Sequence, residues 1–403
     1  MAPSPETFGH LLTEAVYRIR SIEAKSIAIV QDELGYTMGR ETGGSAIEYW
    51  RKNHVPTSPD EVEQLAREIV RRTDLSRVWI EQFLKSTDYP RWRALCDELF
   101  PPLPPPLPAP PPQLESYSME MPLAPFVAGP PIMHCRQFFG REDELRRIFG
   151  VLGRFPLQHI AVIGPQRSGK TSLLHYLKSI TRTPPQQLRP GQRADWLKQA
   201  DRYRWVFVDF QDPRMCGLDG LLPHLLAGLH LPIPARCTLS AFMDVASRGL
   251  HNPAVILLDE IGSALESPEL DLKFWWSLRS LCTNQTSGHL GVILTSQQPP
   301  MQQAHDYEKP SPFFNIFHRM DLGPLTEPAA RALIANSPQP FADAEAEWIL
   351  EQSGGWPVLL QILCSAQLEA LERGAADSAW REEGLYQIGP YRYLLDARER
   401  VKG

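Results

Sequence analysis

One short run, Gly164–Ser172, contains the residue types that bind phosphate groups. It reads Gly-Pro-Gln-Arg-Ser-Gly-Lys-Thr-Ser and fits the pattern G-x-x-x-x-G-K-T. In this pattern backbone N–H groups converge on phosphate oxygens, the lysine reaches the β- and γ-phosphates, and the threonine hydroxyl binds Mg²⁺. An apolar run, Ile160–Ile163, precedes the loop and a helical pattern follows it, as such a loop requires. We therefore predict phosphate-binding roles for Gly164, Pro165, Gln166, Arg167, Ser168, Gly169, Lys170, Thr171 and Ser172.

Two acidic residues end a second apolar run, Ala254–Leu258, which predicts a buried central strand. Asp259 and Glu260 follow at its carboxyl end, where open α/β sheets bind their ligands. We expect Asp259 to hold Mg²⁺ through water, together with the Thr171 hydroxyl. We expect Glu260 to polarise the water that attacks the γ-phosphate.

A third apolar strand ends in two hydroxyl residues, Thr295 and Ser296. If it lies between the other two strands, one of these hydroxyls contacts the γ-phosphate or the attacking water, although hydroxyls also end strands for ordinary turn reasons. Two arginines, Arg279 and Arg319, either sense the γ-phosphate or form structural ion pairs. The predicted catalytic group is Lys170, Glu260, Ser296 and Arg319, and the predicted metal ligands are Thr171 and Asp259.

The composition is that of an ordinary globular protein with room for two or three domains, with 403 residues, 43% hydrophobic and 22% charged. No apolar stretch approaches the length of a membrane span and the N-terminus lacks the plan of a secretory signal, so we expect no membrane contact and a cytoplasmic location. The six cysteines are scattered without a C-x-x-C pair, which favours free thiols. A net charge of −6 argues against general coating of nucleic acid.

A proline-rich segment divides the chain. Nine of the twelve residues in Pro101–Pro112 are proline, which predicts an extended polyproline rod. We expect a linker over 101–132 that acts as a spacer or as a ligand for an aromatic-grooved domain. It separates an all-α domain over 1–100 from a nucleotide-binding core over 133–324, which is followed by a helical lid and tail over 325–403.

Residues 1–100 carry apolar residues at helical spacing. The predicted helices are Phe8–Ile19, Ala24–Leu34, Ser45–Asn53, Pro59–Arg72 and Ser76–Lys85. The segment resembles Xre-type helix-turn-helix domains through Phe8–Leu12 and through Ala46–Lys52 at the position of the recognition helix, although the turn Tyr36–Gly44 is long. Thirteen basic against sixteen acidic residues disfavour DNA binding, while a small basic patch of Arg40, Arg51 and Lys52 keeps DNA contact open beside protein docking.

Strands and helices alternate after Phe138, which predicts a parallel sheet covered on both faces. The predicted strands are Leu157–Ile163, Trp205–Phe210, Ala254–Leu258, Leu290–Thr295 and Arg319–Leu322. The predicted lid helices are Ala329–Asn336, Asp343–Gln352 and Pro357–Leu371. The long connection Thr183–Arg204 is either a partner surface or a disordered loop.

Residues 138–373 resemble the AAA-like ATPases of the signal-transducing (STAND) and origin-recognition branch of the P-loop family. Besides the two signatures above, Phe138–Leu145 matches the opening motif of that group and Gly354–Pro357 matches its lid motif. The resemblance implies an α/β P-loop NTPase fold with a five-stranded parallel sheet and a helical lid. It also implies adenine as the base, and no guanine-reading N-K-x-D motif is present. The residues implied at the base site are Phe139, Gly140, Arg141 and Pro357.

We predict a slow ATPase with ATP or ADP and Mg²⁺ as its ligands. Because Pro357–Ala366 lacks the lid arginine of ordinary AAA+ machines, the resemblance implies a switch rather than a motor. Such a switch would oligomerise on binding ATP and signal through its N-terminal helices, in bacterial defence or transcriptional control. A second interpretation is a DNA-binding AAA+ ATPase that assembles on duplex DNA, and a third is a scaffold without hydrolysis, which Glu260 disfavours. The expected partners are copies of the chain, an unknown protein and, in the second interpretation, DNA.

Overall fold

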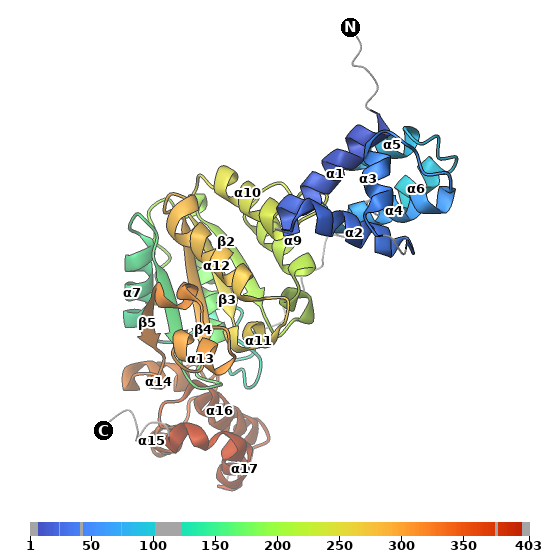
Figure 1. The fold of residues 1–403 in the computed structure, drawn as a ribbon. Helices are drawn as coiled ribbons and strands as arrows, with labels where there is room; N and C mark the ends of the chain where they lie inside the picture. The colour runs from blue at the N-terminus through green and yellow to red at the C-terminus, as the bar shows by residue number, and fades with distance from the viewer. Residues whose placement is uncertain are drawn as a thin grey trace, which may run out of the picture. The chain divides into compact units, whose positions relative to one another are not determined.

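The computed structural model shown in Figure 1 describes residues 7–23, 25–40, 43–73, 75–100, 123–374 and 378–396. The chain divides into two compact units, Met1–Met121 and Pro122–Gly403. The predicted polyproline rod, Pro101–Pro112, lies outside the described residues. None of the helices in the described ranges is both long and apolar enough to cross a membrane.

The first unit contains six α-helices within its described residues. They are α1 (Phe8–Glu23), α2 (Ile27–Thr37), α3 (Ser45–Arg51), α4 (Pro59–Arg72), α5 (Arg77–Lys85) and α6 (Trp92–Leu99). Their apolar faces form one core, in which the Phe83 ring lies 5.2 Å from the Phe8 ring and 5.4 Å from the Trp79 ring. The sequence predicted five helices and missed α6, the eight-residue helix that directly precedes the proline-rich segment.

The second unit is built on a parallel sheet of five strands, which confirms the predicted fold class. The strands are β1 (His159–Ile163), β2 (Arg204–Asp209), β3 (Ala254–Asp259), β4 (Leu290–Ser296) and β5 (Phe317–Asp321). Their order across the sheet is β2-β3-β4-β1-β5. The strand that ends in two hydroxyls therefore does lie between the phosphate-loop strand and the acidic strand, as predicted.

Helices cover both faces of the sheet, and Figure 1 shows α7 on one side and α9, α10 and α12 on the other. One face packs against α7 (Glu142–Leu152) and α8 (Lys170–Ile180). The other packs against α9 (Leu218–Gly228), α10 (Leu239–Gly249), α11 (Ile261–Glu266), α12 (Leu272–Ser280) and α13 (Pro300–Asp306). Every residue of β1, β3 and β4 is buried, as expected for central strands of a doubly covered parallel sheet.

A helical lid follows β5. It consists of α14 (Glu327–Ile334), α15 (Asp343–Ser353), α16 (Pro357–Glu372) and α17 (Ala379–Ile388), where the sequence predicted the first three. A separate apolar cluster holds these helices together. The connection Thr183–Arg204 is not a disordered loop, because Leu197 and Tyr203 are buried in the layer formed by α7 and α8.

The first residue of β1, His159, gives the sheet a pH dependence. The imidazole is 6% exposed, and its Nδ1 accepts the Val292 N–H at 3.1 Å, so Nδ1 must be unprotonated. Burial lowers its pKa to about 4 from the ordinary 6.5. The neutral ring thus contributes stability in full above pH 6.5, and this contribution is lost as the pH falls through the folded pKa near 4.

We predict that His159→Asn flattens the pH dependence of unfolding. The wild-type chain should lose on the order of 3 kcal/mol of unfolding free energy from this group between pH 7.5 and 4, because each unit of pKa shift corresponds to about 1.4 kcal/mol. Urea unfolding at several pH values measures the difference. Equal pH slopes in variant and wild type would contradict the assignment.

Candidate nucleotide-binding site

The loop between β1 and α8 has a backbone shape that explains its glycines. Arg167 and Gly169 have φ angles of 64° and 94°, in the left-handed region. A Cβ atom on Gly164 would lie 2.7 Å from the Leu322 carbonyl oxygen, so this position accepts only glycine. The loop directs the N-terminus of α8 into a cleft, an arrangement that favours an anion.

Lys170 lies in this cleft, which has a volume of about 390 Å³. Its side chain is buried, and Nζ donates hydrogen bonds to the Gly164 and Pro165 carbonyl oxygens, both at 3.0 Å. The Glu260 carboxylate is 3.8 Å from the same nitrogen. Burial lowers the pKa of Lys170, while the charges of Glu260 and Asp259 oppose this shift. The lysine is therefore a desolvated cation facing two acids.

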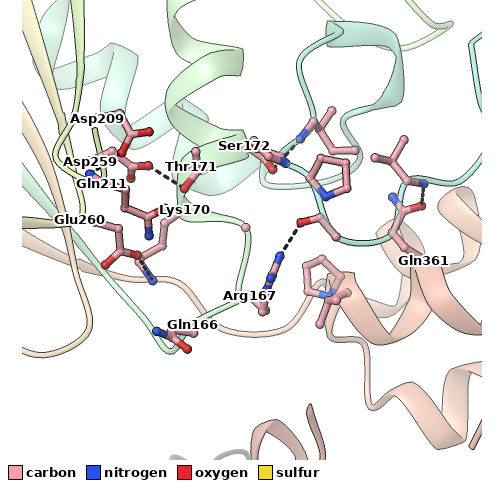
Figure 2. Close-up of a pocket in the computed structure, with 18 residues that line it drawn as sticks. Gln166, Arg167, Lys170, Thr171, Ser172, Asp209, Gln211, Asp259, Glu260 and Gln361 are labelled. Atoms are coloured by element: carbon pink, nitrogen blue, oxygen red, sulfur yellow. Dashed lines mark hydrogen bonds and ion pairs between the residues drawn. The ribbon is translucent and has the colours of Figure 1, made fainter. Parts of the chain in front are cut away.

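The Asp259 carboxylate joins three elements at the edge of the sheet. The Thr171 hydroxyl of α8 donates to Oδ2 at 2.7 Å (Figure 2). The Thr295 hydroxyl of β4 donates to Oδ1 at 2.7 Å. Thr295 also accepts the Glu260 N–H at 2.9 Å, and Glu260 has a left-handed φ of 53°. Burial is the main cause that raises the pKa of both acids.

Two of the predicted catalytic residues, Ser296 and Arg319, do not line the cleft. Thr295, not Ser296, contacts the acids; the Ser296 hydroxyl is buried and has no hydrogen-bond partner among the described residues. Arg319 lies on the edge strand β5, exposed, and pairs with Asp321 at 2.8 Å. Arg279 donates to the Pro312 carbonyl oxygen at 2.5 Å. Neither arginine lines the cleft of this chain.

Asp209 and Gln211 line the cleft as well, and the sequence analysis missed both. Asp209 ends β2 and is in register with Asp259 on the neighbouring strand. In Figure 2 the two carboxylates lie beside each other, to the left of Thr171. The sequence did contain a signal, because Asp209 follows an apolar run. The predicted strand Trp205–Phe210, however, treated Asp209 as an interior residue rather than as the end of the strand.

A smaller hollow adjoins the cleft on the lid side, and the predicted residues Phe139 and Pro357 both line it. The Phe139 ring is buried against lid residues, and the Arg189 guanidinium lies 4.0 Å from its centroid on the connection 183–204. Gly140 has a φ of 69°, and a Cβ there would approach Ala329 to 2.6 Å. The sequence analysis did not foresee that the long connection supports this wall.

Arg141 links the phosphate loop to the start of the lid. Its buried guanidinium donates to the carbonyl oxygens of Ser168 at 3.2 Å, Gly323 at 2.6 Å and Pro324 at 3.4 Å. It also pairs with Glu144 at 3.1 Å. The resemblance placed Arg141 at the base site, and the structure adds that its side chain fastens the segment between β5 and α14.

Residues 123–132, which we name the strap, close one side of the cleft. The sequence predicted them as linker, but they belong to the second compact unit and contact both the lid and α8. Val127, Gly129 and Ile132 line the cleft opposite the phosphate loop. Figure 2 shows the strap running between Ser172 and Gln361.

The donor set at Thr171 and Asp259 fits Mg²⁺, which prefers hard oxygen ligands and takes few from protein when phosphates supply the rest. Consistent with this, the described residues contain no group of three or more His, Cys, Asp or Glu side chains able to hold a metal alone.

No protein-family model matches the chain. No curated protein matches it either. Among solved structures, the chain is similar to the Walker-type ATPase paby2304 of Pyrococcus abyssi, with 16% identity and a TM-score of 0.45. The similarity covers 68% of this chain and 79% of that chain.

Two further solved structures are similar to the chain. The Aeropyrum pernix ORC2 protein in its ADP form has 12% identity, covers 64% of this chain and 70% of its own, and has a TM-score of 0.42. Domain III of the Thermotoga maritima replication initiation protein DnaA has 12% identity and a TM-score of 0.40. The similarity covers 66% of this chain and 98% of that chain. Identities and TM-scores this low carry no argument about function, so any functional proposal must rest on the geometry of the site.

We predict that Thr295→Val and Ser296→Ala differ in stability. Removing the Thr295 hydroxyl leaves a buried Glu260 N–H and one Asp259 oxygen without a partner, which should cost about 1–3 kcal/mol of unfolding free energy. Removing the unpaired Ser296 hydroxyl should cost less than about 0.5 kcal/mol or stabilise the chain slightly. Urea unfolding of the two variants measures this. An equal loss in both would contradict the arrangement.

Proposed function

We propose that the chain is an ATP-binding and ATP-hydrolysing regulatory switch. The observation that supports this is the meeting of Lys170, Thr171, Asp259 and Glu260 in one cleft, although Thr171 and Asp259 are 88 residues apart in sequence. A phosphate-binding lysine, a pair of oxygen ligands for a metal and a partly buried acid together form the set that phosphoryl transfer to water needs.

Each residue has a role that its contacts allow. Lys170 would exchange its two loop carbonyls for phosphate oxygens, which carry full negative charge and bind an ammonium more strongly. Thr171 and Asp259 would hold Mg²⁺, which neutralises phosphate charge when bound. Glu260 would accept a proton from the attacking water, and its raised pKa makes it a stronger base than an exposed glutamate. Asp209, in register with Asp259 on the neighbouring strand, would add a further carboxylate near the metal.

We propose that nucleotide binding at this site switches the protein between two states rather than drives a processive motor. Arg141 connects the phosphate loop to the base of the lid, so a ligand that shifts one shifts the other. We propose that ATP favours assembly of several copies and that the N-terminal helices pass the signal to a partner. Adenine as the base and the setting in bacterial signalling rest on the family resemblance alone.

DNA binding by the N-terminal unit has weaker support. Arg40 is paired with Glu61, and Lys52 is 3.1 Å from Glu48, so two of the three predicted basic residues already have acidic partners. Contact with phosphates would have to compete with these pairs. DNA therefore enters only as one outcome of the assembly experiment below.

We predict that Lys170→Ala abolishes binding of ATP and ADP, because the buried cation facing the phosphates is lost. Glu260→Gln should keep nucleotide binding and reduce turnover at least about a hundredfold, within the range for general bases. Lys178→Ala is the matched control, since Lys178 lies exposed on the same helix. Isothermal titration calorimetry measures nucleotide binding, and release of inorganic phosphate measures turnover. Retained ATP affinity in Lys170→Ala would overturn the site.

We predict that ATP with Mg²⁺ raises the light-scattering mass of the Glu260→Gln variant, whereas ADP leaves the mass unchanged. The variant is used because bound ATP persists in it. Growth of the mass only when duplex DNA is added would instead favour the DNA-assembling ATPase. An unchanged mass in every condition would contradict the proposed oligomerisation.

A further inference from the structure

The strap is fastened to the lid by a buried ring and by hydrogen bonds. Phe126 is 7% exposed, belongs to the apolar cluster of the lid, and stacks on Phe341 with ring centroids 6.1 Å apart. The Val127 N–H donates to Gln361 Oε1 on α16 at 2.8 Å. Asn336 Nδ2, just after α14, donates to the Pro125 carbonyl oxygen at 2.9 Å. One half of the strap therefore belongs to the lid.

The other half of the strap is fastened to the phosphate-binding elements. The Ile132 N–H donates to the Ser172 hydroxyl on α8 at 3.0 Å. The Arg167 guanidinium, from the phosphate loop itself, donates to the Gly129 carbonyl oxygen, as the dashed line in Figure 2 shows. The strap thus spans the cleft, with one end on the lid and the other on the loop that binds phosphate.

The cleft is lined by all three parts at once. Val127, Gly129 and Ile132 of the strap face it together with Lys170 of the phosphate loop and Pro357 of the lid. A nucleotide in the cleft would therefore contact the strap and both of its supports. Consider a ligand that binds the cleft more tightly when the strap is docked than when it is released. The ratio of these two affinities is the factor by which the ligand shifts the equilibrium toward docking.

Docking of the strap is marginal by itself, because one buried ring and a few hydrogen bonds oppose the conformational entropy of ten ordered residues. The strap is also the first described part of the second unit, and residues 101–122 connect it to the N-terminal helices. Release of residues 123–132 would lengthen that connection by up to about 33 Å, at about 3.3 Å for each extended residue.

We propose that the strap senses occupancy of the nucleotide site: bound nucleotide docks residues 123–132, and loss of nucleotide releases them and lengthens the tether of the N-terminal unit. This proposal rests on the proposed nucleotide binding. The acids that would face a γ-phosphate, Asp259 and Glu260, make no hydrogen bond to the strap among the described residues. ADP and ATP therefore dock the strap alike, whereas assembly requires ATP.

Hydrogen exchange of the full chain, measured by mass spectrometry, tests the proposal. Peptides covering 123–133 should exchange at least about tenfold more slowly with saturating ADP than without nucleotide. The same protection is expected with ATP and Mg²⁺ in the Glu260→Gln variant. Protection by ATP only would overturn the occupancy sensor, and so would identical exchange in all states of a chain that binds nucleotide.

Two variants test the strap from its lid side. Phe126→Ala removes the buried ring and Asn336→Ala removes one hydrogen bond; neither residue lines the cleft. Phe126→Ala should speed exchange over 123–133 and weaken the affinity for a fluorescent ADP analogue by about tenfold or more, and Asn336→Ala should do so to a smaller extent. Met133→Ala, at an exposed position beside the strap, is the matched control.

The outcomes separate this proposal from the proposed function. Unchanged nucleotide affinity in both strap variants, with faster exchange over 123–133, would overturn the coupling and leave the nucleotide switch intact. Failure of the wild-type chain to bind ADP or ATP would overturn the proposed function, and the strap proposal with it.

Discussion

Both oxygens of the Asp259 carboxylate are held by threonine hydroxyls, and the arrangement of the cleft depends on these contacts. Thr171 and Thr295 bring α8 and β4 to the end of β3, and Thr295 also fixes the backbone of Glu260. A carboxylate buried without such donors would be costly, so the acid and the two hydroxyls require one another. Because β4 lies between β1 and β3, the sheet order makes this meeting possible.

The lid is connected to this centre by routes that avoid the acids. Arg141 ties the Ser168 carbonyl oxygen to the segment that begins the lid, and the strap ties Gln361 and Ser172 to opposite sides of the cleft. These connections use groups of residues other than Asp259 and Glu260. In the proposed function, chemistry at the γ-phosphate and occupancy of the site would therefore be sensed by different parts of the same unit.

The N-terminal unit has its own core and its own ion pairs, including Arg72 with Glu23 at 2.6 Å. Nothing in its core depends on the sheet. The second unit holds the proposed nucleotide site, and covalent connection through the strap is the route we assign to communication between it and the N-terminal unit. A tether whose length changes needs no fixed interface between the two units.

The sequence by itself determined the phosphate loop, the acid pair and the parallel sheet, because each depends on residues adjacent in the chain or on local periodicity. Tertiary structure decided which hydroxyl contacts Asp259, since Thr295 and Ser296 are adjacent and occupy opposite faces of β4. It also decided that residues 123–132 form a strap, because Val127 meets its acceptor 234 residues away. Contacts of that separation leave no periodic or composition signal in the sequence, so only the folded chain reveals them.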